Sequence, residues 1–230
     1  MAAKPSRRAL VDALRGIELS MSARTVPFGS EPDDSRGVVH WSVEGHVDVE
    51  ADEGPTWSSD SLALADATPP EEGQLSLWVF AMSGMTINTM QADVLWALDA
   101  RDADSAHLLS LFDSDGEYTE DVLEAIESAD GSSTLVLIDR VQVPTGWRGL
   151  GVGRLLVDRA LDLVTQDNNA VVALQSYPYL DEPDPPQEAL DRTDHVWESL
   201  GFVRIGSDVF ARDQTLIHSY ADQVQRRLGL

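Results

Sequence analysis

The chain has 230 residues, 43% of them hydrophobic, which is enough to bury one sizeable core with an extension. It carries 40 acidic residues against 16 basic ones, and its net charge of -24 argues against binding to nucleic acid or to an anionic membrane and favours cationic partners. The lack of cysteine excludes disulfides, thiolate-bound zinc and a cysteine nucleophile. Charged residues interrupt the apolar core that a signal peptide would need, and no apolar run is as long as a membrane span, so we expect a cytoplasmic protein.

The first part of the chain is predicted to combine an extension with two strands. Residues 1–36 are expected to form an N-terminal helix and loop extension, because 5–16 have the apolar spacing of a short helix and a loop rich in Gly, Ser, Pro and Asp follows from Ser22 to Gly37. Apolar residues at alternate positions from Val39 to Val49 predict a half-buried strand with a β-bulge at Gly45. A second strand is expected over 75–82.

Three helices are predicted next, heavily flanked by Asp and Glu, as solvated helical faces usually are; they span 90–98, 106–112 and 119–126. The second and third are joined by acidic residues spaced as in a calcium loop that starts at Asp113. The sharp turn of such a loop needs glycine at its sixth position, but Gly116 is at the fourth. We therefore expect a turn that precedes a helix. His40 and His46 lack a further ligand at convincing spacing, and no metal site is predicted.

From residue 134 onward the pattern is that of a strand, helix, strand unit with additions. The predicted elements are a strand over 134–143, a helix over 152–165, a strand over 170–176, a helix over 187–200 and a hairpin over 202–212. The second strand is continuously apolar, which favours a position covered on both faces and a parallel neighbour. Residues 213–230, beginning at a capping Asp213, are predicted as an amphipathic helix that packs on the core or on a second copy of the chain, as in a homodimer.

The sequence W-R-G-L-G-V-G-R at 147–154 joins the first of these strands to the helix. Its three glycines leave the backbone N–H groups accessible, and the helix N-terminus adds unpaired donors with a partial positive charge, so the segment predicts an anion cradle. A nucleotide P-loop would need lysine and then serine or threonine after Gly151, and the dinucleotide fingerprint would need glycine or alanine in place of Arg154. Both alternatives fail, which leaves another kind of phosphate loop or a glycine turn needed only for close packing.

Arg148, Gly151 and Gly153 form the pattern R-x-x-G-x-G directly after the strand L-V-L-I-D-R-V-Q-V-P. This arrangement resembles the GCN5-related N-acetyltransferase (GNAT) family, in which such a loop holds the pyrophosphate of acetyl-coenzyme A. The segment V-W-E-S-L-G-F at 196–202 looks like the family's second conserved segment, where a helix ends at a Gly-Phe pair. The resemblance covers 134–212, about a third of the chain.

The resemblance implies an α/β (mixed α+β) fold with a GNAT-like central mixed, splayed β-sheet flanked by helices. An N-terminal extension and extra helices before the cofactor strand would be added to it, and the acetyltransferase domain would span 37–212. The family usually places an antiparallel hairpin just before the cofactor strand, a position that helical segments take in this sequence. Either the early strands fill those sheet positions with helices inserted, or the first half of the fold is rebuilt.

The resemblance also implies an activity, the direct transfer of an acetyl group from acetyl-CoA to a primary amine in a ternary complex. We expect a cationic acceptor, either a small molecule or a peptide. The backbone of the strand would bind the pantetheine arm and the loop would bind the phosphates. The implied cofactor-binding residues are Val141, Val143, Arg148, Gly149, Leu150, Gly151, Val152, Gly153 and Arg154.

Aminolysis of a thioester needs a free amine, so a proton acceptor helps the reaction. Strict alternation along the strand places Asp139 on the face of Leu137, Val141 and Val143, and a carboxylate on an apolar face tends towards a raised pKa, which suits a base. The alternatives are a structural aspartate paired with an arginine, or a bulge that turns the side chain outward.

Family members commonly use a tyrosine at the start of Y-x-x-x-G-F to protonate the leaving thiolate. That position is Trp197, and an indole N–H is no practical proton donor. Tyr177 and Tyr179, just after the second parallel strand, are the nearest replacements, followed by Ser176 and His195. Trp197 equally allows an alternative function, a non-catalytic regulatory protein that binds coenzyme A through the same fold.

Overall fold

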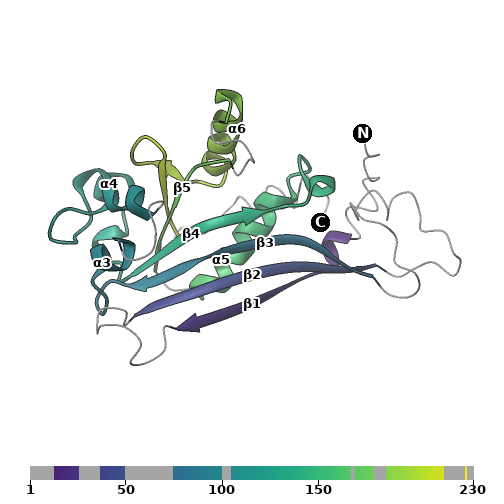
Figure 1. The fold of residues 1–230 in the computed structure, drawn as a ribbon, viewed down its shortest axis with the longest axis horizontal. Coiled ribbons are helices and arrows are strands. Elements are labelled where there is room, and N and C mark those ends of the chain that lie inside the picture. The colour runs from purple at the N-terminus through teal and green to yellow at the C-terminus, as the bar shows by residue number, and fades with distance from the viewer. Residues whose placement is uncertain are drawn as a thin grey trace, which may run out of the picture.

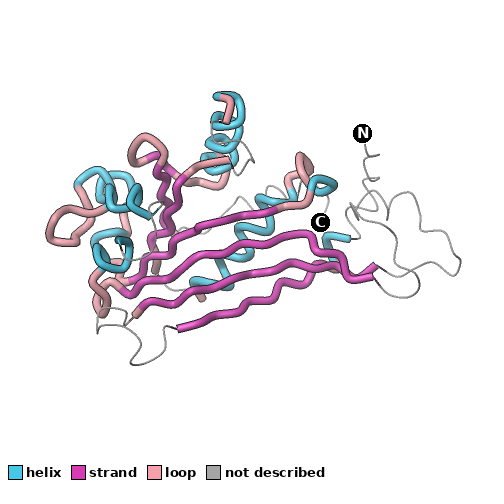
Figure 2. The backbone as a smooth tube through the Cα atoms, in the orientation of Figure 1, coloured by secondary structure: helices cyan, strands magenta, loops and turns pink. Residues whose placement is uncertain are grey.

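The computed structural model describes residues 13–25, 37–49, 75–99, 105–166, 169–178, 185–214 and 226. They form a seven-stranded sheet with the order β1-β2-β3-β4-β5-β7-β6 (Figures 1 and 2). The pair β4 and β5 is parallel, and every other neighbouring pair is antiparallel. The strands are β1 Ile17–Thr25, β2 Val38–Val49, β3 Leu75–Asn88, β4 Thr134–Gln142, β5 Val171–Gln175, β6 Val203–Arg204 and β7 Val209–Asp213. This mixed sheet confirms the predicted fold class.

The α-helices are α3 Val94–Asp99, α4 Glu120–Ala125, α5 Val152–Thr165 and α6 Gln187–Glu198. The described residues also form the short 3₁₀ helices η2 Ser105–Leu111, η3 Ala129–Gly131 and η4 Thr145–Trp147. In Figure 1, α5 lies behind the long strands, whereas α3 and α4 gather at one end of the sheet. None of the helices in the described ranges combines the length and apolar character that crossing a bilayer requires.

Two hydrophobic cores lie on the two faces of the sheet. The core on the α5 face includes Trp41, Val43, Phe80, Val136 and Leu156. The core on the other face is covered by α3, η2 and α4 and includes Met85, Ile87, Leu98, Leu111 and Leu137. Strands β4 and β5 contribute side chains to both cores, which explains their continuous apolar runs and agrees with the parallel neighbour predicted for them.

The N-terminal prediction was wrong over residues 17–25, where the helix and loop extension was expected to contain no strand. They form β1, an edge strand paired with β2 along its whole length. The apolar positions of I-E-L-S-M-S-A-R-T alternate with polar ones, and Ile17 and Leu19 pack against the α5-side core. Residues 13–15 are helical, and the rest of the predicted helix over 5–16 lies outside the described residues.

The early strands fill the sheet positions beside β4, and the predicted extra helices are inserted between β3 and β4. Strand β3 continues to Asn88, beyond the predicted end at residue 82. The register of β2 and β3 shifts at Gly45, as predicted, but the additional residue is Val79 on β3. Residues 113–117 form the expected turn, in which Asp113 Oδ1 accepts hydrogen bonds from the backbone N–H groups of Asp115 and Glu117.

The second half of the chain follows the predicted strand, helix, strand and hairpin order closely. One difference is Asp213, which is the buried last residue of β7 and does not begin a helix there. The helix expected over 213–230 otherwise falls almost wholly outside the described residues, so its packing and the homodimer stay predictions.

Candidate functional site

Strands β4 and β5 separate halfway along β4. Their parallel pairing ends at Ile138 and Leu174, yet β4 continues to Gln142, paired only with β3 in the part of the chain that the structure describes. Strand β5 meanwhile continues with β7 to its end. Figure 2 shows β5 and β7 turning steeply away from the direction of the long strands. Beyond Ile138, β4 and β5 therefore no longer pair with each other within the described residues, which matches a splayed sheet.

A β-bulge lies at the point of separation. Ser83 pairs with Arg140 and Gly84 with Ile138, so Asp139 is the extra residue on β4. A Cβ atom on Gly84 would lie 1.9 Å from the carbonyl oxygen of Leu137 and 2.6 Å from the Trp41 ring, so only glycine allows β3 and β4 to approach this closely.

The bulge corrects the expected orientation of Asp139. Leu137 packs in the core under α3 and α4, whereas Val141 and Val143 pack against the α5-side core, so the three apolar side chains do not share a face. Asp139 is exposed. Alternation fails because the extra residue inverts the side-chain direction along the strand. The apolar face on which the role of Asp139 as a base was predicted does not surround it, and the role itself stays a prediction.

The predicted anion cradle is formed by backbone. Gly149 and Gly151 have left-handed φ angles of +73° and +82°, which glycine adopts without strain. Gly151 caps α5 and no side chain caps the helix, so the N–H groups of Val152, Gly153 and Arg154 are the free donors of a helix N-terminus.

Two contacts attach this loop to the end of β4. Arg148 Nε donates a hydrogen bond of 2.7 Å to the carbonyl oxygen of Val143, which uses one of the five guanidinium N–H donors. A Cβ on Gly153 would lie 3.1 Å from Val143 Cγ2, so the first turn of α5 packs closely on the same residue. A Cβ on Gly149 would meet no atom within 4 Å, which leaves open space beside the loop. These features fit a pyrophosphate group.

Trp197 is a core residue at the end of α6. It is buried in the α5-side core, and its ring meets that of Phe202 edge-on with centroids 5.3 Å apart. The N–H of Phe202 donates to the carbonyl of Trp197 and the N–H of Gly201 to that of Glu198, which is the Schellman ending of a helix with Gly201 at φ +84°. The segment V-W-E-S-L-G-F therefore has a complete structural explanation in this chain.

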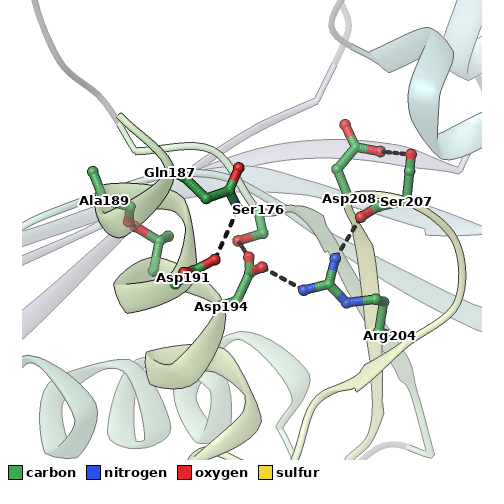
Figure 3. Close-up of polar contacts among 9 residues, drawn as sticks. Ser176, Gln187, Ala189, Asp191, Asp194, Arg204, Ser207 and Asp208 are labelled. Carbon is green, nitrogen blue, oxygen red and sulfur yellow. Dashed lines mark hydrogen bonds and ion pairs between the residues drawn. The ribbon is translucent and has the colours of Figure 1, made fainter. Parts of the chain in front are cut away.

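Sequence reasoning missed a polar network at the end of β5. Ser176 Oγ donates a hydrogen bond of 2.6 Å to Asp194 of α6, and the other Asp194 oxygen is paired with Arg204 of β6 (Figure 3). On the opposite side, Gln175 Nε2 donates to Asp208 Oδ2 at 2.7 Å, and His107 of η2 lies 3.2 Å from the same oxygen.

The carboxyl group of Asp208 experiences opposing effects. Partial burial raises its pKa, but hydrogen bonds from Gln175 and Ser207 and the interaction with His107 outweigh that effect, so the pKa lies below the ordinary value. Two other predicted residues of this region are exposed, and Tyr179 lies outside the described residues. Tyr177, 50% exposed, follows Ser176, and His195 lies on α6.

A buried ion pair, also absent from the sequence predictions, joins α5 to β7. Arg212 Nη2 lies 2.7 Å from Asp158 Oδ1, and both side chains are almost fully buried. Arg212 Nη1 also donates to the carbonyl of Leu200 at the end of α6, at 2.8 Å. One guanidinium group therefore connects two helices and a strand behind the splayed edge.

No family model matches the sequence, and none of the curated proteins is similar to it. Among solved structures, the crystal structure of Arabidopsis thaliana NAA60 in complex with a bisubstrate analogue is similar to 84% of this chain and 99% of that chain, with a TM-score of 0.35 and 8% identity. A similarity this low assigns neither a family nor a residue role to this chain. The strand order and the parallel β4–β5 pair themselves show a mixed sheet of the kind predicted from the sequence.

Proposed function

We propose that this protein is an acetyl-CoA-dependent N-acetyltransferase that transfers acetyl directly to a cationic primary amine in a ternary complex. The observation that carries the proposal is that two features lie next to each other in the unit formed by β4, the glycine loop and α5. The N-terminus of α5, which has Gly151 as its N-cap and no side-chain cap, follows the strand that parts from its parallel neighbour. A polyanion with a long polar arm needs both features, a cradle for its phosphates and a free strand edge for its amides.

The donor half of the site is formed by residues 139–154. The N–H groups of the first turn of α5 would bind the pyrophosphate, and Arg148 would add charge from the loop that it already attaches to Val143. The backbone of β4 near Val141 and Val143 has no second strand in the described chain and would hydrogen-bond the pantetheine amides. With the arm bound in this way, the thioester would lie in the gap between β4 and β5.

The reaction replaces a thioester bond with an amide bond. The amine nitrogen attacks the thioester carbonyl carbon with its lone pair, and the C–S bond then breaks with its electrons leaving on sulfur. The nitrogen loses a proton and the thiolate takes one up, so no covalent intermediate on the protein and no redox partner are needed. Asp139 and Tyr177 are the sequence-based candidates for these proton transfers.

A cationic acceptor suits the charge of this protein. The whole chain has a net charge of -24, which raises the local concentration of cations around it. An amine that arrives protonated is drawn to the negatively charged protein, whereas an acidic acceptor is repelled from it.

Isothermal titration calorimetry with acetyl-CoA tests the donor half of the proposal. We expect wild-type binding and a loss of affinity of about tenfold in Arg148→Ala, because one charge-assisted phosphate contact is removed. Arg192→Ala is the matched control, since Arg192 Nε also donates to a backbone carbonyl, that of Glu188, but within α6. A wild-type protein that does not bind acetyl-CoA at millimolar concentration contradicts the proposal.

A second candidate function is a non-catalytic regulatory protein that binds coenzyme A. The observation in its favour is Trp197, which fills the core at the position where family members carry a tyrosine. Release of free thiol from acetyl-CoA separates the two functions when measured with polyamines, aminoglycosides, amino acids and peptides. Binding of acetyl-CoA without thiol release for any of these amines favours the regulatory protein.

A further inference from the structure

Ser176 is a buried polar residue at the opening between β4 and β5. It follows β5 directly and lies two positions beyond Leu174, where the parallel pairing ends. Its side chain is 3% exposed, and its backbone N–H donates to the carbonyl oxygen of Asp208 at 2.7 Å. The residue is therefore held in place on the β5 side of the gap.

The direction of the hydrogen bond to Asp194 defines what Ser176 offers to a ligand. A carboxylate only accepts hydrogen bonds, so the hydroxyl proton of Ser176 points to Asp194 Oδ1, 2.6 Å away. No other described group donates to Ser176 Oγ, and the lone pairs of this oxygen are the part of the hydroxyl that a ligand can use. The partner that complements it must be a hydrogen-bond donor.

Asp194 is itself held in place by a second partner. Rotation of the Ser176 hydroxyl away from it would therefore break a hydrogen bond to an oriented carboxylate. Its second oxygen is paired with Arg204, whose guanidinium also donates to the carbonyl of Ser207 and stacks on the Phe210 ring at 4.7 Å (Figure 3). The bonds run from the end of β5 through α6 to the β6–β7 turn. A chain of charge-assisted contacts of this kind orients a single lone pair more firmly than one isolated hydrogen bond.

We propose that Ser176 binds the acceptor amine, its Oγ accepting an N–H of the nitrogen that attacks the thioester, and that Asp194 is the positioning residue that holds the Ser176 hydroxyl. This inference rests on the proposed function. It assigns the acceptor class by chemistry, since a primary amine has an N–H to donate and a lone pair left for attack, whereas a quaternary ammonium group has no N–H. It also separates Ser176 from the role of proton donor to sulfur, because its own proton is engaged with Asp194.

The test measures acetyl transfer to the panel of polyamines, aminoglycosides, amino acids and peptides together with acetyl-CoA affinity. Ser176→Ala is expected to lower kcat/KM for the amine about tenfold or more, with acetyl-CoA affinity changed less than about twofold. Ser176→Thr keeps the hydroxyl and is expected to recover most of the lost activity. Asp194→Asn is expected to resemble Ser176→Ala, because an amide can donate to Oγ and so occupy the lone pair that the amine needs.

Two matched variants control for effects on folding. Asp191→Asn makes the same change on the same helix, at a carboxylate that accepts from Gln187, and Ser199→Ala removes a hydroxyl that donates to a carbonyl of α6. Both should keep wild-type kinetics. Amine kinetics that are unchanged in Ser176→Ala, or an equal loss of acetyl-CoA affinity, overturn the inference.

The failures of the inference and of the proposed function are distinguishable. Acetyl-CoA that binds wild-type protein but is transferred to no amine of the panel overturns the role of Ser176 and leaves the donor half intact. A protein that does not bind acetyl-CoA overturns the proposed function and the inference together. Competition adds an independent check. A primary alkylamine should compete with the acceptor amine and so inhibit its acetylation, whereas the quaternary analogue, which has no N–H to donate to Ser176, should not inhibit.

Discussion

The two strands at the centre of this sheet end in two different kinds of structure. At the end of β4, the loop and the start of α5 present glycines and backbone N–H groups, all within residues 139–154. At the end of β5, the site consists of side chains from β5, α6, β6, the β6–β7 turn and η2, and three of its hydrogen bonds connect residues 10, 18 and 33 positions apart.

This difference separates what the two regions can recognise. Backbone groups in a fixed local conformation can bind a phosphate whatever molecule carries it, so the first region would recognise the phosphates of the proposed cosubstrate. Side chains collected from distant elements can change one at a time, so the second region suits an acceptor particular to this protein. The buried pair of Arg212 and Asp158 joins α5 of the first region to β7 of the second.

Breaking that buried pair should damage both regions at once, and it is the largest effect that we expect. Asp158→Ala leaves the Arg212 guanidinium buried without its counterion, which should lower the free energy of unfolding by about 3–5 kcal/mol. Urea denaturation followed by tryptophan fluorescence measures the change, and acetyl-CoA binding and acetyl transfer should both fall as the protein destabilises.

The double variant Asp158→Leu with Arg212→Met separates the effect of the two charges from the effect of the volume that the two side chains fill. Replacing both charges with apolar side chains removes the uncompensated charge, so much of the lost stability should return. A single Asp158→Ala variant that loses less than about 1 kcal/mol would show that the two regions are not held together by this pair.

Gly84→Ala should affect the splayed edge next most strongly. The new Cβ would lie 1.9 Å from the Leu137 carbonyl oxygen, so β3 and β4 must move apart at the bulge, at a cost of about 2–3 kcal/mol. Calorimetric titration should also detect weaker acetyl-CoA binding, because the bulge fixes the course of the β4 edge. Gly131→Ala is the matched control, since a Cβ there meets no atom within 4 Å. Equal stability of the two variants would contradict the role of Gly84.

The local region could largely be predicted from the sequence, for physical reasons. Strand β4, the glycine loop and α5 are consecutive, and α5 begins and ends where the apolar spacing placed it. A β-bulge leaves little trace in such spacing, so Asp139 was assigned to the wrong face, and the one signal was Gly84 within an apolar run. The edge strand β1 had period-two alternation, but its serines and its glycine- and proline-rich sequel made a loop the more natural interpretation.

The region at the end of β5 could not be predicted, because its contacts depend on tertiary packing. Nothing in the sequence near Ser176 indicates Asp194, 18 positions later, and Asp194 looks like any solvated carboxylate of an acidic helix. The same holds for Arg212. Its neighbour in sequence is Asp213, and nothing near it indicates that its partner is Asp158, on a different element. Residue spacing along one element predicts a helix end or a loop, whereas these pairs require the sheet order to be known first.

The smallest effect that we expect is a pH dependence at Asp208. Its pKa is lowered in the folded protein, so its hydrogen bonds with Gln175 and Ser207 and its contact with His107 stabilise the fold at pH values above the unfolded pKa of about 4. This contribution is lost as the pH falls through the folded pKa, because a protonated carboxyl no longer favours these partners. Asp208→Asn should therefore be less stable than wild type by under about 1 kcal/mol at pH 7, since solvent screens a partly exposed group, and the difference should shrink below pH 4. Because both proteins carry nearly the same large negative charge, general acid destabilisation cancels in the difference between their unfolding free energies. Two stability curves that stay parallel from pH 7 to pH 3 would show that the Asp208 carboxylate does not help attach η2 to the β6–β7 turn. The region at the end of β5 would then be held by the contact between Ser176 and Asp194 alone.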